Sequence, residues 1–185
     1  MKKTTNLVKI LVEGLFYPAV LGTVFVLFLY RITANEDVSK ALSDCALYWG
    51  VVLILYFSAS YIMMKDRDYN GWALLIDMLE TLLIFIAYYN LGYFDSPQPA
   101  LANWTFFYLL MAPIPFLHQV WNKVIDYPIT SKHMVPATLS TVVFIIGVIW
   151  NDMYWWINYS LCFLHLVLLS TYIYKLPVLI ELKSS

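Results

Sequence analysis

Long apolar stretches separated by short polar joints run along the whole chain. They cover residues of about 7–30, 42–64, 71–94, 102–122, 134–150 and 153–174. A helix needs roughly 20 apolar residues to cross about 30 Å of hydrocarbon, and it satisfies its own backbone hydrogen bonds where water is absent. The pattern predicts an all-α, polytopic integral membrane protein built as a bundle of six transmembrane helices.

The joints between these stretches carry polar and helix-breaking residues. They read Asn35-Glu36-Asp37, Lys65-Asp66-Arg67-Asp68, Ser96-Pro97-Gln98-Pro99, Asp126-Tyr127-Pro128 and Asn151-Asp152. Such clusters interrupt helices, and the last joint is so short that the two spans beside it are expected to form an antiparallel hairpin. We find no internal repeat or long linker, so residues 1–185 are predicted to form a single transmembrane domain.

Positive charges alternate strongly between the two sides that six spans define. One side receives nine of the 11 Lys and Arg residues, and the other side receives the remaining two. The first group is Lys2, Lys3, Lys9, Lys65, Arg67, Lys123, Lys132, Lys175 and Lys183, and the second is Arg31 and Lys40. Cytoplasmic loops carry the excess of positive charge, so both the N- and C-termini are predicted to be cytoplasmic.

Several spans contain residues that disturb a helix or allow close packing. Pro113 and Pro115 lack backbone donors near the middle of the fourth span, which predicts a kink with freed carbonyl groups. Gly14, Pro18 and Gly22 predict that the first span is bent or closely packed. The fifth span offers small residues for helix contact: Ala137, Thr138, Ser140, Thr141 and Gly147.

The composition supports the membrane class and excludes others. The chain is 62% hydrophobic and 12% charged, with a mean hydropathy of +0.71, whereas soluble domains carry about 25% charged residues. A net charge of -1 and scattered basic residues give no nucleic-acid surface. Cys45 and Cys162 show neither disulfide nor zinc spacing. The seven Trp residues fall toward span ends, which predicts interfacial aromatic belts.

Two carboxylic acids, Asp77 and Glu80, lie inside the third apolar stretch. A charged side chain at mid-bilayer costs about 2.5–3.5 kcal/mol, so these acids must be solvated, paired or protonated. Helical spacing puts them on one stripe. A rise of about 1.5 Å per residue places Asp77 roughly 9 Å and Glu80 roughly 14 Å from the cytoplasmic edge. The stripe comprises Ala73, Asp77, Glu80, Thr81, Ile84 and Tyr88.

Other spans supply polar residues that can meet these acids. Glu13 lies in the first span, four residues after Lys9. His118 lies in the fourth span, and Asn158 and His165 share one face of the sixth. Glu13, His118 and His165 are expected in the cytoplasmic half or near the centre of the membrane. Asp77, Glu80, His118, His165, Glu13 and Asn158 therefore form the candidate transport or polar site.

Motifs for other chemistry are missing from the sequence. No span carries a His-x-x-x-His, Glu-x-x-His or His-Glu-x-x-His pattern, so we expect no metal site. There is no Gly-x-Ser-x-Gly, and the chain holds only 6 Gly with no phosphate-binding loop. The two histidines within the spans are too few for a two-haem carrier. We therefore expect no cofactor, and catalytic residues remain unknown.

Three functions fit this pattern. The first is a small channel or transporter whose polar site passes a cation, a proton or a small solute. The second is an intramembrane enzyme acting on a lipid or isoprenoid, with a carboxyl group as general acid or base. The third is a structural or accessory subunit of a larger membrane complex. The expected partners are the lipid bilayer and either a second copy or another membrane subunit, in a bacterial inner membrane or a plasma membrane.

Overall fold

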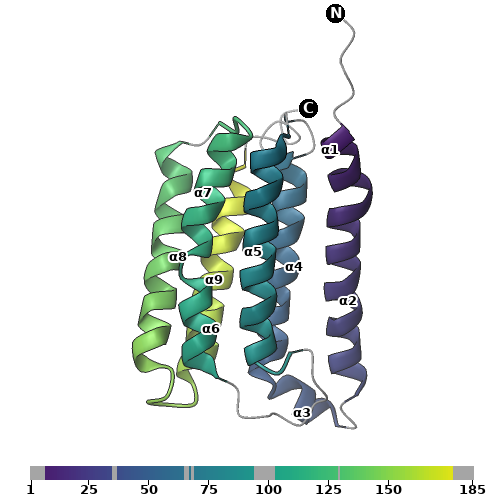
Figure 1. Cartoon of the computed structure of the whole chain (residues 1–185). Coiled ribbons are helices and arrows are strands. Elements are labelled where there is room, and N and C mark those ends of the chain that lie inside the picture. The colour runs from purple at the N-terminus through teal and green to yellow at the C-terminus, as the bar shows by residue number, and fades with distance from the viewer. Residues whose placement is uncertain are drawn as a thin grey trace, which may run out of the picture.

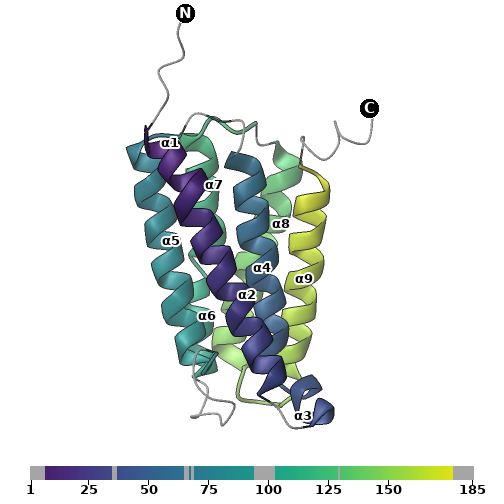
Figure 2. The same ribbon diagram turned by 90° about the vertical axis from the view of Figure 1, so that its right-hand side faces the viewer.

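A computed structural model describes residues 7–34, 37–64, 67, 69–93, 103–128 and 130–176. Every regular element within these ranges is a helix, which confirms the all-α prediction. The elements are α1 (Leu7–Leu11), the π-helical turn η1 (Val12–Phe16), α2 (Tyr17–Thr33), α3 (Val38–Leu42), α4 (Cys45–Met64), α5 (Gly71–Asn90), α6 (Trp104–Met111), α7 (Ile114–Val124), α8 (Ser131–Trp150) and α9 (Ile157–Tyr174). They form one elongated bundle (Figure 1 and Figure 2).

Five helices of the described chain are long and apolar enough to cross a membrane. They are Leu7–Thr33, Cys45–Met64, Gly71–Asn90, His133–Trp150 and Ile157–Tyr174. Their outer faces carry large apolar side chains; on α5, Leu75, Met78 and Leu82 are 56%, 54% and 57% exposed. Continuous exposed apolar surface of this kind suits lipid rather than water. The chain is therefore a multi-pass helical membrane protein.

The fourth predicted span is two helices rather than one. α6 has 8 residues and α7 has 11, and a turn at Ala112 and Pro113 separates them. The two follow each other along the bundle, and both pack against α5 and α8 (Figure 1). Neither Pro113 nor Pro115 can donate a backbone hydrogen bond to the preceding turn. The disturbance expected at these prolines is thus a complete break in the helix.

The first span is a single rod of 27 residues with a local change of winding. The π-helical turn η1 directly precedes Pro18, which lies in the first turn of α2. Such wide turns accommodate residues that interrupt the regular hydrogen-bond ladder. A Cβ added at Gly14 or Gly22 would meet nothing within 4 Å. The distortion expected here is present, whereas Gly14 and Gly22 make no close packing contact with the part of the chain that the structure describes.

Close helix packing occurs instead at Gly147 on α8. A Cβ added there would lie 2.5 Å from the ring of Tyr108 on α6. Gly50 on α4 is similar, because an added Cβ would lie 2.4 Å from the Tyr93 hydroxyl oxygen. The expected role of Gly147 as a contact residue is therefore met inside the chain.

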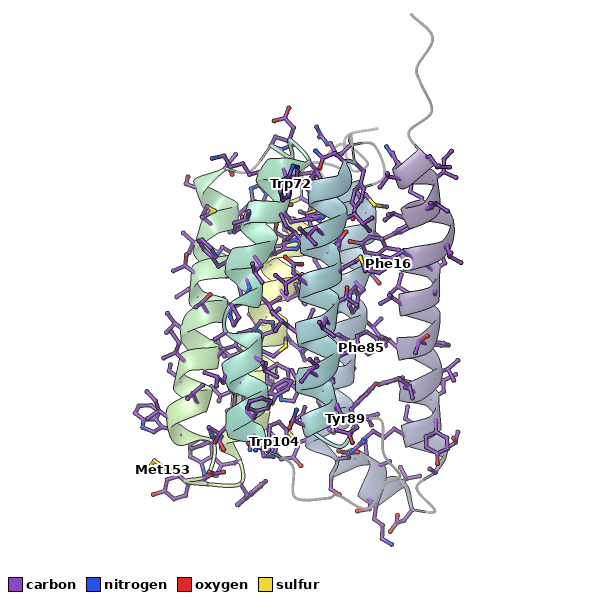
Figure 3. The ribbon with its side chains drawn as sticks, viewed as in Figure 1. Phe16, Trp72, Phe85, Tyr89, Trp104 and Met153 are labelled. Atoms are coloured by element: carbon purple, nitrogen blue, oxygen red, sulfur yellow. The ribbon has the colours of Figure 1, made fainter. Side chains whose placement is uncertain are left out.

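The tryptophans divide between the surface and the core. Trp72 and Trp155 are 71% and 80% exposed near opposite ends of the bundle; Figure 3 shows Trp72 at one end and Met153, in the loop before α9, at the other. Trp49 and Trp121 are fully buried, so their assignment to an aromatic belt is wrong. Trp49 instead belongs to an aromatic core, where its ring centroid lies 4.9 Å from that of Phe107.

A buried arginine links α2 to two other segments at the end of the bundle opposite Trp72. Arg31, near the end of α2, is ion-paired with Asp44 and donates from Nη1 to the carbonyl of Gly92 at 2.5 Å. Its guanidinium carbon lies 5.6 Å from the centre of the Tyr93 ring. Burial raises the pKa of Tyr93 to about 12, against the opposing effect of Arg31. Gly92 has φ +64°, the left-handed conformation that a glycine adopts most readily.

The basic residues that the structure describes keep the predicted asymmetry. Lys9, Arg67, Lys123 and Lys175 fall at helix ends on one side of the bundle, and Arg31 and Lys40 fall on the other. The remaining charges of the count, Lys2, Lys3, Lys65 and Lys183, and the side chain of Lys132 lie outside the described residues. The same holds for the joints at residues 35–36 and 94–102.

Candidate functional site

The acids of α5 face the interior of the bundle. The Asn70 side chain accepts hydrogen bonds from the backbone of Trp72 and Ala73, both at 3.0 Å, and so starts the helix. From this start the predicted stripe is buried except at Thr81, which is half-buried: Ala73, Asp77, Glu80, Ile84 and Tyr88 are at most 5% exposed. The sequence therefore identified the inward face of α5 correctly.

Two phenol groups bind the Asp77 carboxyl group. Tyr17 on α2 donates to Oδ1 at 2.9 Å, and Tyr69, just before α5, donates to Oδ2. Both tyrosines are fully buried. Burial, reinforced by the negative charge of Asp77, raises the pKa of Tyr69 above its usual value, so this phenol keeps its proton and remains a donor.

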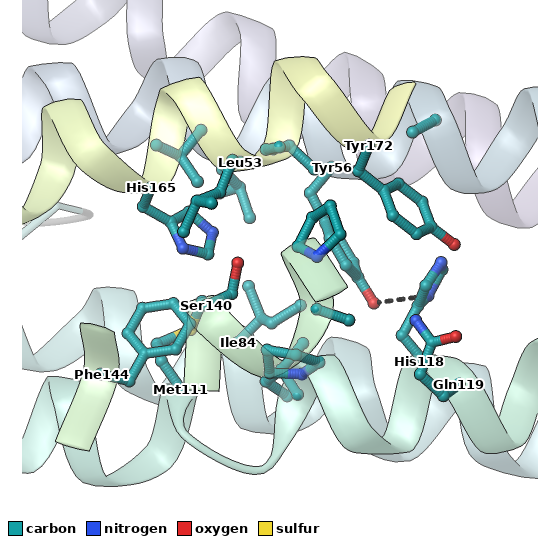
Figure 4. Close-up of a pocket in the computed structure, with 18 of the residues that line it drawn as sticks. Leu53, Tyr56, Ile84, Met111, His118, Gln119, Ser140, Phe144, His165 and Tyr172 are labelled. Atoms are coloured by element: carbon teal, nitrogen blue, oxygen red, sulfur yellow. Dashed lines mark hydrogen bonds between the residues drawn. The ribbon is translucent and has the colours of Figure 1, made fainter. Parts of the chain in front are cut away.

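A phenol and an imidazole bind Glu80. Tyr56 on α4 donates to Glu80 Oε2, and its oxygen lies 3.2 Å from His118 Nδ1 on α7. His118 Nδ1 is 3.6 Å from Glu80 Oε2, and its ring stacks on Trp121 at 5.2 Å between centroids. Figure 4 shows the contact between Tyr56 and His118. The second oxygen, Oε1, is buried and has no hydrogen-bond partner within the described residues.

Together these residues form what we call the acid cluster: Tyr17, Tyr56, Tyr69, Asp77, Glu80 and His118. Within the described chain, none of the hydrogen bonds or ion pairs of its two carboxyl groups comes from Lys or Arg. With both acids ionised, even a protonated His118 leaves one negative charge unbalanced. An unbalanced buried charge is strongly unfavourable. The cluster can remove it by taking up a proton or a cation, and that uptake is the chemistry the arrangement offers.

A cavity of about 60 Å³ adjoins the acid cluster. Tyr56 and His118 line one end of it, and Ser140 on α8 and His165 on α9 line the other (Figure 4). The His165 ring lies 4.6 Å from Phe144 and 5.8 Å from Trp49 between centroids. His165 occupies the middle of α9, as expected, but it faces this cavity and makes no direct contact with an acid.

Two of the predicted site residues do not join the cluster. Glu13 pairs with Lys9 at 3.9 Å, and the two side chains are 33% and 24% exposed. Asn158 begins α9 at the opposite end of the bundle and accepts a hydrogen bond from the Tyr108 hydroxyl at 2.9 Å. Glu13 is thus a helical ion pair of the ordinary kind, and Asn158 links α9 to α6.

The residues that sequence reasoning missed are the tyrosines. Tyr56 and Tyr69 are two of 15 Tyr in the chain, and neither has a neighbour whose spacing reveals its role. Tyr17 shares a helical face with Glu13 at i,i+4, which placed it on a polar stripe without indicating Asp77 as its partner. A tyrosine in an aromatic-rich membrane bundle is ordinarily core or interface.

Within the described ranges, no group of three or more His, Cys, Asp and Glu side chains is arranged to hold a metal ion. Cys45 and Cys162 are both free and buried. No protein-family model, curated protein or solved structure with which the chain was compared matches it.

Proposed function

We propose that this protein moves protons across the membrane and that the acid cluster is its proton-binding site. The observation that carries the proposal is the burial of Asp77 and Glu80, which are 5% and 2% exposed. Their hydrogen-bond and ion-pair partners in the described chain are phenol and imidazole groups, with no Lys or Arg among them. Intramembrane acids and histidines mark proton and ion routes. Each uptake or release of a proton changes the net charge of this low-dielectric site.

The hydrogen-bond directions favour a proton over a metal cation. Tyr17 and Tyr69 each direct a hydroxyl hydrogen at Asp77, and Tyr56 directs one at Glu80. A hard cation requires several oxygen lone pairs converging on one point. Here the phenol hydrogens already occupy lone pairs of the carboxyl oxygens. A proton needs only one free lone pair, and Glu80 Oε1 has no partner in the described chain.

In this proposal α6 and α7 together make the fourth of six spans, and both termini are cytoplasmic. The pair extends from Trp104 to Val124 beside the long helices α5 and α8. The positive-inside rule then places the acid cluster nearer the cytoplasmic face, because Asp77 lies only about two turns from the start of α5. A bacterial inner membrane or a plasma membrane is the proposed location.

The two alternative functions have less support from the geometry. The cavity beside the acid cluster, about 60 Å³, suits molecules of the size of water and is too small for an isoprenoid or lipid chain. A wider groove of about 670 Å³ lies between α2 and α5, but no residue of the acid cluster lines it. Docking of an accessory partner through α8 loses its main contact point, because Gly147 packs against Tyr108 of the same chain.

Proton flux into liposomes tests the proposal. The purified protein is reconstituted with a pH-sensitive dye inside, and a potassium gradient with valinomycin drives protons inward. We expect flux in the wild type that falls to the level of protein-free liposomes in Asp77→Asn and Glu80→Gln.

Matched controls make the same chemical changes away from the site. Glu13→Gln removes an acid from the partly exposed pair with Lys9, and Asp152→Asn removes one from the exposed loop before α9. Both controls should keep wild-type flux. Equal flux in folded Asp77→Asn, Glu80→Gln and wild-type protein contradicts the proposal, as does a wild type with no flux.

A further inference from the structure

The cavity beside the acid cluster contains polar groups that no other described residue satisfies. The Ser140 hydroxyl and both ring nitrogens of His165 lack hydrogen bonds within the described chain, although these residues are 6% and 7% exposed. The Gln119 carbonyl oxygen is likewise buried without a partner. All three side chains line the cavity. Ser140 and His165 stand at one end and Gln119 beside His118 at the other (Figure 4).

Leaving these polar groups without hydrogen-bond partners is energetically unfavourable. Each buried donor or acceptor without a partner costs about 1–3 kcal/mol, and water bound in a polar cavity normally removes that penalty. A cavity needs roughly 10–15 Å³ to hold a water molecule, whose share of liquid volume is about 30 Å³, so about 60 Å³ has room for on the order of two to four waters. The partners that water requires are present at both ends.

We propose that this cavity is a binding site for a short chain of water molecules and that His165 accepts the proton that leaves the acid cluster through them. The inference rests on the proposed function and names the next group on the route. His165 is suited to this task because a neutral imidazole can accept a proton on one nitrogen and release another from the second. Its two nitrogens make no competing hydrogen bond in the described chain.

The transfer needs no reagent besides water. A proton of the Glu80 carboxyl group reaches the cavity by way of His118, which lies 3.6 Å from Glu80 and lines the cavity. An N–H bond of protonated His118 then breaks, and the proton passes to the nearest cavity water. Successive waters each gain one proton and give up another, until an N–H bond forms on His165. Glu80 returns to carboxylate and His118 to neutral imidazole, His165 becomes imidazolium, and no electrons are transferred.

The surroundings of His165 leave few competing acceptors. The other titratable groups that line the cavity are Tyr56 from α4, Tyr88 from α5, His118 from α7 and Tyr172 from α9. Tyr88 donates to the Trp49 carbonyl at 2.6 Å, and Tyr172 accepts from Asn122 at 3.1 Å. Tyr56 donates to Glu80. His165 is therefore the titratable group of this described lining whose polar atoms have no hydrogen-bond partner.

Aromatic side chains close the route beyond His165. Trp49 and Phe144 contact its ring, and Phe107 and Tyr108 pack against Trp49 at 4.9 and 5.8 Å between centroids. The carbon faces of these rings offer water no hydrogen-bond partner; the Trp49 indole N–H is the exception, buried without a partner in the described chain. His165 is thus the last proton-binding group before the seal, which makes it the natural acceptor on this side.

Flux measurements on cavity variants test the inference. His165→Phe keeps a flat ring but cannot bind a proton, and Ser140→Val removes a hydroxyl and adds a methyl group. Both should lose most of the flux, because they break the route at its far end. The matched control is Thr138→Val, which makes a similar change on the exposed side of the same helix and should leave the flux unchanged.

Hydroxyl radicals generated by X-rays from bound water report the water site independently of flux. Met111 lines the cavity and Met78 faces lipid, so Met111 should be oxidised well above Met78 in the wild type, and less so in Ser140→Val. Flux that depends on Asp77 and Glu80 but survives both cavity substitutions overturns this inference alone, and so does equal oxidation of the two methionines. A wild type with no proton flux overturns the proposed function and the relay together.

Discussion

The Tyr56 hydroxyl links two proton-binding groups of the acid cluster, Glu80 on α5 and His118 on α7. It donates to Glu80 and lies 3.2 Å from His118. A hydrogen bond to a charged group contributes about 1.5–3 kcal/mol, so we expect Tyr56→Phe to lower both the stability in detergent and the proton flux. Thermal unfolding and the liposome assay measure the two effects.

The control for this substitution lies on the same helix. Tyr61 is half-buried on α4, and its hydroxyl makes no hydrogen bond within the described chain. Tyr61→Phe should therefore behave as wild type in both assays. Identical behaviour of the two variants would show that the Tyr56 hydroxyl does not hold the cluster together.

The sequence predicts those site residues whose ionisable side chains contrast with apolar neighbours. Asp77, Glu80 and His118 stand out because ionisable groups are rare in apolar stretches, and the structure brings all three into one cluster. Tyr56 and Tyr69 give no such contrast, since their hydroxyl groups look like those of any membrane tyrosine. Glu13 stands out from its apolar neighbours just as Asp77 does, but it pairs with Lys9, four residues earlier in the same span. Which of the two acids points into the bundle depends on how each helix is rotated about its axis.

Packing of α8 against α6 depends on the absence of a side chain at Gly147. The Tyr108 ring fills that space and cannot swing aside freely, because its hydroxyl is bonded to Asn158 and its ring touches Trp49. We expect Gly147→Ala to lower the free energy of unfolding by about 1–3 kcal/mol, the usual penalty for overpacking. The midpoint of thermal or denaturant unfolding in detergent measures it.

The same substitution at Gly22 isolates this effect from helix propensity. An alanine there meets no atom within 4 Å, and alanine favours a helix over glycine by about 1 kcal/mol. Gly22→Ala should therefore be neutral or stabilising. A loss of stability at Gly22 equal to that at Gly147 would remove the packing explanation.

At the scale of elements, the length of each apolar run predicted that a helix exists better than it predicted where that helix begins and ends. The third, fifth and sixth stretches became α5, α8 and α9, with ends shifted by up to four residues. The second stretch starts as α4 only at Cys45, and its first residue, Leu42, ends the separate helix α3. The Asp37 side chain caps α3 by accepting from Ser39 at 2.8 Å. Prolines located the disturbance between α6 and α7, but the choice between a kink and a break depends on packing against α5 and α8.

The orientation of the whole molecule gives a prediction of its own. With both termini cytoplasmic, Lys123 at the end of α7 faces the cytoplasm, and Asp152 in the loop between α8 and α9 faces outward. In intact cells a membrane-impermeant maleimide should label Asp152→Cys at once and Lys123→Cys only after permeabilisation. Both native cysteines are buried, which keeps the background low. The reverse labelling order would invert the proposed topology.

Whole-molecule architecture was predictable only in outline. Hydropathy alone predicts a helical membrane bundle, because the lipid solvent leaves few alternatives for the backbone. It does not predict which helices become neighbours. The cavity between α4, α7, α8 and α9 exists because His165, Ser140 and Tyr56 face one another across the bundle, and no spacing within a single span encodes that meeting.

The central claim is that Glu80, within the acid cluster, takes up and releases a proton. Infrared difference spectra between high and low pH test it most directly, because the carbonyl stretch of a carboxyl group appears only when that group is protonated. We predict a carboxyl band in the wild type that disappears in Glu80→Gln and persists in the matched variant Glu13→Gln. A band that is the same in Glu80→Gln as in the wild type would contradict the account.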